Sequence, residues 1–194
     1  MDRISEITRN TNETRIYMKL NLDGSGKSDI HTGIGFFDHM LSAVAKHGLM
    51  DLTVRVQGDL AVDGHHTVED TGIVLGAALA QALGDKKGIR RVGSCFLPMD
   101  ESLAFCALDI SGRPYLAFDA AFPAEMCGGY ASELTEEFFR AVSVSSGITL
   151  HLKAEGRNTH HMIEALYKAF ARALRDAAAL DPRVKGVPST KGVL

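Results

Sequence analysis

The order of hydrophobic and polar residues along the chain predicts two successive series of strands and helices. In the first half, alternating segments are typical of strands, and segments with apolar residues every three to four positions are typical of amphipathic helices. The predicted strands are residues 15–22, 28–31 and 52–56, and the predicted helices are residues 37–47 and 67–83. Gly84 follows the second helix, where glycine commonly ends one. The first half therefore has the expected order β-β-α-β-α.

The second half repeats that order. Its predicted strands are residues 103–110, 115–122 and 148–154, and its predicted helices are residues 133–144 and 161–179. We therefore expect a protein of the α/β (α+β) class, internally duplicated, with sheets packed against helices. Residues 1–194 would form a single pseudo-symmetric domain, with repeat 1 at about 1–92 and repeat 2 at about 93–180.

Two segments lie outside these repeats. Residues 84–98 are short and rich in Gly and Arg, and they are predicted to form a hinge between the two fused copies. The tail, residues 181–194, contains two prolines and two glycines and is not expected to be helical. Its composition favours a frayed terminus. Its Ser-Thr-Lys-Gly ending (residues 189–192) could instead close over an anion, with Lys191 as a point charge.

The bulk composition excludes several classes of protein. The 194 residues are 45% hydrophobic and 23% charged, and the net charge of −3 argues against nucleic acid as a partner. The three cysteines form no C-x-x-C motif, so a disulfide framework or thiolate zinc site is not expected. The N-terminus has no apolar signal core, and the longest apolar run, around residues 73–83, is too short to cross a bilayer. We expect a soluble, cytoplasmic protein without a membrane partner.

A His-His-x-x-Glu motif occurs twice, at residues 65–69 and 160–164, near the start of the last helix in each half. Residues four apart share a face of a helix, so His65 and Glu69 are expected to bind one ion, and His160 and Glu164 another. Adjacent residues point about 100° apart, so the second histidine of each motif is expected to reach a different ion. Two such motifs facing each other would build a dinuclear metal site.

Imidazole and carboxylate ligands without thiolate suit Mn, Fe, Co, Ni or Zn. His39, on the earlier helix of the first half, is a further candidate ligand, and Glu137 occupies the matching position in the second half. His31 and His47 are weaker candidates. His151 lies in an alternating strand and is predicted to be structural rather than a ligand.

Positively charged residues form a second constellation. Lys168 lies four positions after Glu164, on the same helix face, and fits an anionic group such as a phosphate bound beside the metals. The other members are Arg90, Arg91, Arg113 and Lys191. A dinucleotide fingerprint, a P-loop, an H-E-x-x-H motif and a G-x-S-x-G elbow are absent from the sequence.

The segments of the chain that contain these motifs and charged residues together resemble the imidazoleglycerol-phosphate dehydratase family of histidine biosynthesis. The resemblance covers nearly the whole chain, and the two His-His-x-x-Glu segments and the Ser-Thr-Lys-Gly tail are its most specific parts. The matching segments are residues 8–16, 31–41, 63–73, 86–93, 98–104, 109–116, 156–174 and 189–192.

The resemblance implies a manganese-dependent hydro-lyase that converts imidazole glycerol phosphate to imidazole acetol phosphate. It implies a duplicated fold of the ribosomal-protein-S5-domain-2-like type and a 24-subunit assembly of trimers, with active sites between subunits. Two Mn²⁺ ions per site are implied, one held by His39, His66, His160 and Glu164, the other by His65, Glu69, Glu137 and His161. Some relatives have histidine at position 137, and His151 is the alternative ligand.

The resemblance also assigns roles to the charged residues. Glu13 becomes a catalytic carboxylate that reaches a neighbouring subunit's site, and Glu69 and Glu164 are weaker candidates because they are committed to metal. The metal ligands would also contact the substrate, except Glu137. The residues implied around the substrate, chiefly its phosphate, are His47, Arg91, Arg113, Lys168, Ser189, Thr190 and Lys191.

The reaction explains why metals are needed. The C–H bond to be broken has no neighbouring carbonyl, so the imidazole ring must accept the electrons, which it does best as an imidazolate stabilised by cations. Two other classes share some of these features. A dinuclear metallohydrolase would release inorganic phosphate, and a metal-binding structural assembly would bind no substrate. Lys168 and the tail argue against the structural assembly.

Overall fold

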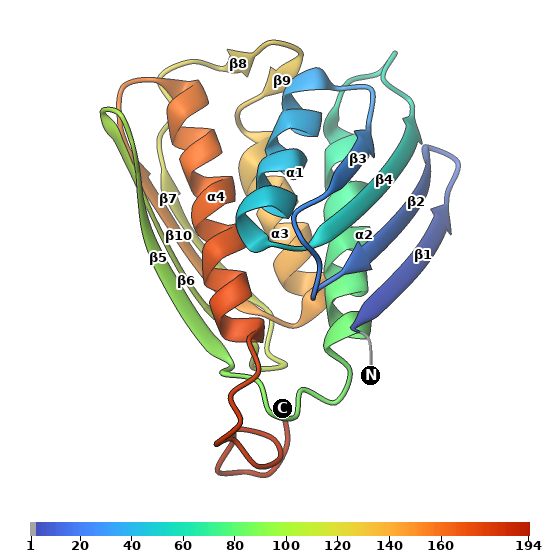
Figure 1. Ribbon diagram of the computed structural model, residues 1–194. Helices are drawn as coiled ribbons and strands as arrows, with labels where there is room; N and C mark the ends of the chain where they lie inside the picture. Colours follow the sequence, from blue (N-terminus) through green and yellow to red (C-terminus); the bar gives the residue numbers. More distant parts are fainter. Residues whose placement is uncertain (1–2) are drawn as a thin grey trace.

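The computed structural model describes residues 3–194 and has three layers, in which four helices lie between two four-stranded sheets (Figure 1). The strands of the first sheet, in the order β1-β2-β4-β3, are β1 Ile4–Asn10, β2 Thr14–Asn21, β4 Asp51–Gly58 and β3 Ser28–His31. Those of the second sheet, in the order β5-β6-β10-β7, are β5 Val92–Met99, β6 Ser102–Asp109, β10 Thr149–Glu155 and β7 Tyr115–Ala120. The helices are α1 Gly35–Gly48, α2 His65–Leu83, α3 Leu134–Ser146 and α4 Thr159–Ala178.

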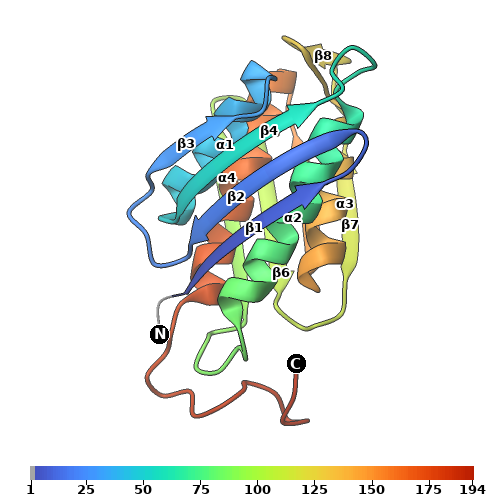
Figure 2. The same ribbon diagram turned by 90° about the vertical axis from the view of Figure 1, so that its right-hand side faces the viewer.

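The two sheets share one topology. In each sheet the first, second and fourth strands along the chain pair antiparallel, and the third strand pairs parallel to the fourth. Figure 2 shows the outer face of the first sheet with β1 at its edge and the helices behind it. A small hairpin, β8 Met126–Cys127 and β9 Tyr130–Ala131, lies outside both sheets.

The predicted α+β class, with sheets packed on helices, is confirmed. All predicted strands and helices are present, and their ends move by at most two residues. The predicted order β-β-α-β-α is wrong, because each half begins with an additional strand, β1 or β5. β1 carries mainly polar side chains, and β5 contains Gly93 and Pro98 within the segment predicted as a hinge. Both are edge strands, where polar residues and proline are tolerated.

Helices from the two halves meet in the middle layer. α1 and α2 cover the first sheet, α3 and α4 cover the second, and the halves join where α2 packs on α3 and α1 on α4. Two glycines of α2 allow close approach, since a Cβ on Gly72 would lie 2.7 Å from the carbonyl oxygen of Phe138 and one on Gly76 2.7 Å from that of Val142. The buried core of this layer includes Phe37, Phe138, Phe139, Tyr167 and Phe170.

All four helices begin at the same end of the molecule, beside β8 and β9, and the tail lies at the opposite end (Figure 1). Both metal motifs are thereby placed in the first turns of their helices. α4 begins at Thr159 because the Asn158 side chain accepts a hydrogen bond from the backbone N–H of His161 at 3.2 Å. α2 begins at His65, whose backbone N–H donates to Asp63 at 2.7 Å. Within residues 3–194, no helix is long and apolar enough to cross a membrane.

Candidate metal and substrate site

Three candidate metal ligands converge between α1 and α4. The ligand atoms of His39, His160 and Glu164 all lie within 4.8 Å of one another. Glu164 Oε2 is 3.0 Å from His160 Nε2 and 3.4 Å from His39 Nε2. The structure thus brings together three of the four residues predicted for the first metal.

Glu164 is the buried member of this cluster, whereas the two histidines are about half exposed. Lys168 Nζ lies 2.6 Å from the other carboxylate oxygen of Glu164, as the spacing of four residues predicts. Burial alone would raise the pKa of Glu164, but the neighbouring Lys168, together with His39 and His160, outweighs it and lowers the pKa. The cluster therefore presents an ionised carboxylate between two imidazoles.

His66, predicted as the fourth ligand of this metal, is not part of the cluster. Its Nδ1 lies 2.9 Å from Asp59 Oδ2, and its Nε2 lies 3.7 Å from Glu13 Oε1. The hydrogen bond with Asp59, with smaller contributions from the Glu13 and Asp59 charges, raises the pKa of His66 despite partial desolvation. Glu13 reaches this position from the turn between β1 and β2.

Most candidates for the second metal lie on α2 and α3. His65 Nε2 is 4.0 Å from Glu69 Oε2, on the same face of α2. Glu69 and Glu137 line one cleft of about 200 Å³ between α2 and α3, and Glu137 also pairs with Arg140 at 3.5 Å. Gly72 and Gly76 bring α2 close to α3 along the same pair of helices.

His161, the remaining predicted ligand of the second metal, lies on α4 and faces the turn between β5 and β6. Its Nδ1 is 2.9 Å from Glu101 Oε2, and its Nε2 is 3.9 Å from Asp100 Oδ2. Hydrogen bonding to Glu101 raises the pKa of His161, and the same bond lowers the pKa of Glu101 to about 2.

The predicted ligands thus fall into two groups. The α1–α4 group is His39, His160, His161 and Glu164, and the α2–α3 group is His65, His66, Glu69 and Glu137. Each predicted metal draws ligands from both groups. Among residues 3–194, ion pairs join ligands within a group, and none joins a member of one group to a member of the other.

The other histidines are distributed differently. His47 lies on α1, and burial followed by the charges of Lys168 and Arg172 lowers its pKa. His151, predicted as a structural histidine, is exposed on the outer face of β10, with its ring 6.3 Å from that of Tyr115. His31 pairs with Asp29 at 3.2 Å on the exposed strand β3.

Of the residues predicted around the phosphate, Lys168 lies beside Glu164, whereas Arg91, Arg113 and the tail form a separate cluster at the opposite end. The Arg91 guanidinium pairs with both carboxylate oxygens of Asp109, at 2.7 and 3.0 Å, and donates to the Pro188 carbonyl at 2.9 Å. Arg113 lies 3.8 Å from the same Asp109. Residues 189–191 of the tail follow Pro188 directly, so Ser189, Thr190 and Lys191 lie near this cluster.

The tail folds back on the chain rather than fraying, contrary to what its composition favours. Gly88 N–H donates to the Gly186 carbonyl at 2.9 Å, and Asp181 N–H donates to the Gly88 carbonyl at 2.8 Å. α4, with 20 residues, separates this end from the His160 end by about 30 Å. One chain therefore places Lys168 beside the metal ligand Glu164 but keeps the Arg91–Arg113 cluster and the tail away from it.

The sequence analysis missed several carboxylates that contact site residues or hold the hairpin that carries Glu13. Asp59 and Glu101 contact the motif histidines, Asp109 pairs with Arg91, and Asp70 holds the β1–β2 hairpin by pairing with Arg9 and accepting from Thr14. Each contact joins residues on different elements. The one available signal was the acidic pair at residues 100–101, which lies in a segment that carries the family resemblance.

The fold and the site together define a class: an α+β protein with a His/Glu cluster suited to a metal ion and with a separate arginine cluster beside the tail. A family model described as Imidazoleglycerol-phosphate dehydratase matches residues 32–174. The chain belongs to this family. It is accordingly an enzyme, a dehydratase of histidine biosynthesis in the lyase class.

Individual relatives agree over the full chain. The imidazoleglycerol-phosphate dehydratase of Symbiobacterium thermophilum is 62% identical over 194 residues, covering 100% of this chain and 93% of that protein. That of Acetivibrio thermocellus is 63% identical over 195 residues, covering 100% of both.

Solved structures show the same fold. The crystal structure of the Staphylococcus aureus N315 enzyme has a TM-score of 0.84 and 42% identity, covering 92% of this chain and 99% of that one. The Pyrococcus furiosus enzyme in complex with (S)-C348 also has a TM-score of 0.84, with 36% identity, covering 97% of this chain and 100% of that one.

Proposed function

We propose that this enzyme dehydrates imidazole glycerol phosphate to imidazole acetol phosphate with two Mn²⁺ ions per active site. The observation that carries the proposal is the convergence of His39, His160 and Glu164. Neighbouring ligands of an octahedral ion with bonds of about 2.1 Å lie about 3 Å apart. The contacts of Glu164 Oε2, at 3.0 and 3.4 Å, fit this spacing.

The ligand chemistry supports the same assignment. Nitrogen and carboxylate ligands without thiolate are acceptable to manganese. When bound, the two cations would supply Lewis acidity that lowers the pKa of the substrate's imidazole and stabilises its imidazolate form. Glu137 is the proposed carboxylate ligand of the second ion because it shares a cleft with Glu69, whereas His151 lies on the outer face of the second sheet.

We infer that the active site is completed by neighbouring subunits of a homo-oligomer. Each proposed metal needs ligands from both the α1–α4 group and the α2–α3 group, and the phosphate contacts other than Lys168 lie near the far end of α4, about 30 Å away. Sharing these parts between subunits would bring them to one small substrate. The family resemblance proposes a 24-mer built from trimers.

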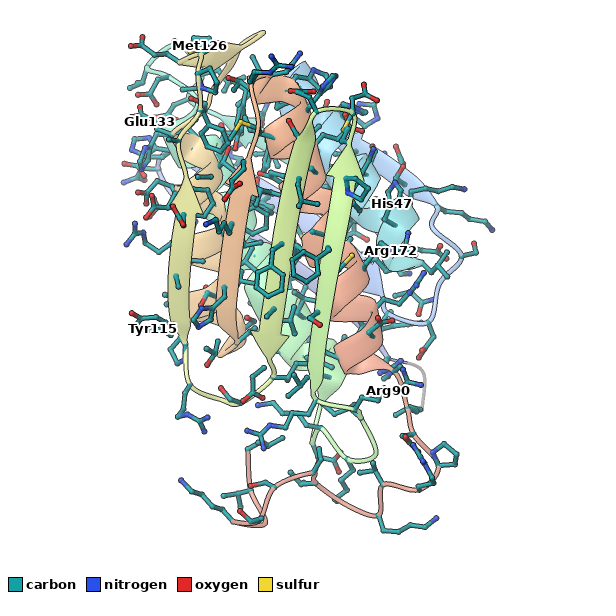
Figure 3. The ribbon with its side chains drawn as sticks, turned by 90° about the vertical axis from the view of Figure 1, so that its left-hand side faces the viewer. His47, Arg90, Tyr115, Met126, Glu133 and Arg172 are labelled. Carbon is teal, nitrogen blue, oxygen red and sulfur yellow. The ribbon has the colours of Figure 1, made fainter. Side chains whose placement is uncertain are left out.

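The outer face of the second sheet supports association. Phe96 and Tyr115 are 70% and 63% exposed, and the ring of Phe96 packs on that of Phe105 at 4.7 Å. Figure 3 faces this surface, with Tyr115 at its edge. Exposed apolar side chains gathered on one face typically mark an interface.

Other residues of the chain are proposed to transfer the proton and to bind the phosphate. Glu13 is proposed to move the proton, because its carboxylate is 52% exposed and it contacts only the His66 imidazole among the ion pairs of the described residues. Glu69 and Glu164 are less suitable because they would be committed to metal. The basic residues and the tail would orient the phosphate, away from the bonds that change.

The shared topology of the two sheets supports the proposed internal duplication. In each half, the turn between the first two strands carries an acidic residue. Each half also places a His-His-x-x-Glu motif at the start of its last helix. His39 and Glu137 lie in the helices α1 and α3, which hold the same place in the two halves.

Turnover of metal-stripped enzyme, with and without added Mn²⁺, tests the function. The keto product and free phosphate should be followed together. We expect Mn²⁺-dependent keto product without phosphate release. Release of inorganic phosphate would instead indicate a metallohydrolase, and metal binding without turnover would indicate a structural metal site.

A further inference from the structure

We propose that Asp59 and Glu101 are positioning residues that hold the rings of His66 and His161 so that Nε2 of each ring faces a metal ion. This inference rests on the proposed metal site. Each of these two histidines is the second in its motif, and each contacts a carboxylate through Nδ1 at 2.9 Å.

The contact between Asp59 and His66 serves the imidazole alone. Asp59 Oδ2 lies on His66 Nδ1, and Asp59 Oδ1 is buried without a hydrogen-bond partner among residues 3–194. The carboxylate therefore has no second partner in the described chain that would explain its position. An Nδ1–H that donates to Asp59 leaves the lone pair of His66 on Nε2.

The contact between Glu101 and His161 also organises the start of α4. Glu101 Oε2 lies on His161 Nδ1, while Oε1 accepts from the Asn158 backbone N–H at 2.8 Å and from the Ser102 hydroxyl at 3.0 Å. Asn158 in turn caps α4 through the N–H of His161. Glu101 thus fixes both the ring and the backbone that carries it.

The first histidines of the motifs are arranged differently. His65 and His160 approach the glutamate of their own motif through Nε2, at 4.0 and 3.0 Å. The second histidines have no such partner within their motif, so a carboxylate from another element is needed to orient them. Metal-binding histidines commonly donate their other N–H to a carboxylate, which fixes the tautomer and the ring orientation.

The position of Glu101 invites comparison with Glu13. Both lie in a turn between the first two strands of their half, and a hydroxyl residue follows each of them, Thr14 or Ser102. The Glu13 side chain is 52% exposed, whereas that of Glu101 is 24% exposed and has both oxygens engaged. Glu101 therefore orients a ligand, and Glu13 remains available to accept a proton.

The test is Mn²⁺ binding to the metal-stripped full-length enzyme, measured by titration calorimetry and by electron paramagnetic resonance of free Mn²⁺. We expect Asp59→Ala and Glu101→Ala each to lower the affinity of the enzyme for one of the two Mn²⁺ ions by roughly 10- to 100-fold. Asp59→Asn should recover most of that affinity, because its amide oxygen still accepts from Nδ1–H. Asp119→Asn, an exposed carboxylate that pairs with Lys153, is the matched control and should bind as the unmodified enzyme does.

The visible spectrum of the Co²⁺-loaded enzyme gives a second readout, since a misplaced imidazole changes the ligand field. If Asp59→Ala binds two Mn²⁺ ions as tightly as the unmodified enzyme and its Co²⁺ spectrum is unchanged, the positioning role is overturned and the metal site stands. Failure of the unmodified enzyme to bind Mn²⁺ would overturn the metal site and this inference together. If Glu101→Ala does not fold, Asp59→Ala decides the question, because among the described residues the Asp59 carboxylate hydrogen-bonds only to the His66 ring.

Discussion

Glu13 lies at the turn between β1 and β2, half exposed and 3.7 Å from an imidazole nitrogen. Glu13→Gln preserves the shape of the side chain but removes its ability to take a proton. We expect kcat to fall by at least roughly 100-fold, as for loss of a general base. Mn²⁺ stoichiometry and substrate binding should be unchanged. Glu6→Gln, on the same hairpin but paired with Lys19, is the control, and surviving turnover in Glu13→Gln would assign the proton to another residue.

Among residues 3–194, Lys168 has one ion-pair partner, Glu164, and its side chain is 19% exposed. If its ammonium also binds the substrate phosphate, Lys168→Met should raise KM by roughly 10- to 100-fold, the worth of a hydrogen bond to a charged group. Bound Mn²⁺ should remain, because the Glu164 carboxylate is still present. Lys19→Met is the control for loss of an exposed lysine. An unchanged KM would limit Lys168 to neutralising Glu164.

At this scale the sequence predicts contacts within a helix better than contacts between elements. The spacing of four residues predicted that His160, Glu164 and Lys168 share one face of a helix, and Glu164 lies within 3.0 Å of both, because helix geometry brings such residues together. Glu101 and His161 lie 60 positions apart, and their contact depends on how the β5–β6 turn packs against α4. No local pattern encodes such a pair.

Among the elements, the contact between α2 and α3 carries the clearest mechanical constraint. A Cβ on Gly76 would lie 2.7 Å from the Val142 carbonyl and 2.7 Å from Ser145 Cβ. We expect Gly76→Ala to force the helices apart and to lower the free energy of unfolding by about 1 to 3 kcal/mol. Thermal and urea denaturation measure this loss. Gly129→Ala, where an added Cβ meets nothing within 4 Å, should change stability little. Equal stability of both variants would show that the packing is looser than the structure indicates.

Helices and strands with one buried side were predictable, because burial of one side produces a periodic pattern of apolar residues. The long helices and central strands have strong periodicity, and all of them were found within two residues. β1 and β5 escaped prediction because edge strands need less apolar surface and tolerate polar residues and proline. Composition favoured a frayed tail for a different reason: the hydrogen bonds between the tail and residues 88–91 are long-range, and composition reveals nothing of them.

For the whole molecule, sharing of the active site between subunits can be tested by mixing. His65→Ala damages the α2–α3 group, and His160→Ala damages the α1–α4 group. Each variant alone should be inactive. If the two groups of one site come from different subunits, random mixing of the two variants should leave roughly a quarter of the active sites with both groups intact. The mixed assemblies should then be active. Mixed particles that form without any regained activity would place both groups of a site in one chain.

The way the halves meet has a consequence for the covalent chain. The main contacts between the halves run through the helix pairs, so the covalent link between α2 and β5 adds little to the contact between the halves themselves. A break after Gly84 would leave two fragments, each with one bare apolar helix surface. Produced together, they should associate and restore the intact particle, whereas each produced alone should aggregate. The polypeptide would then behave as a heterodimer whose partners happen to be encoded in one reading frame.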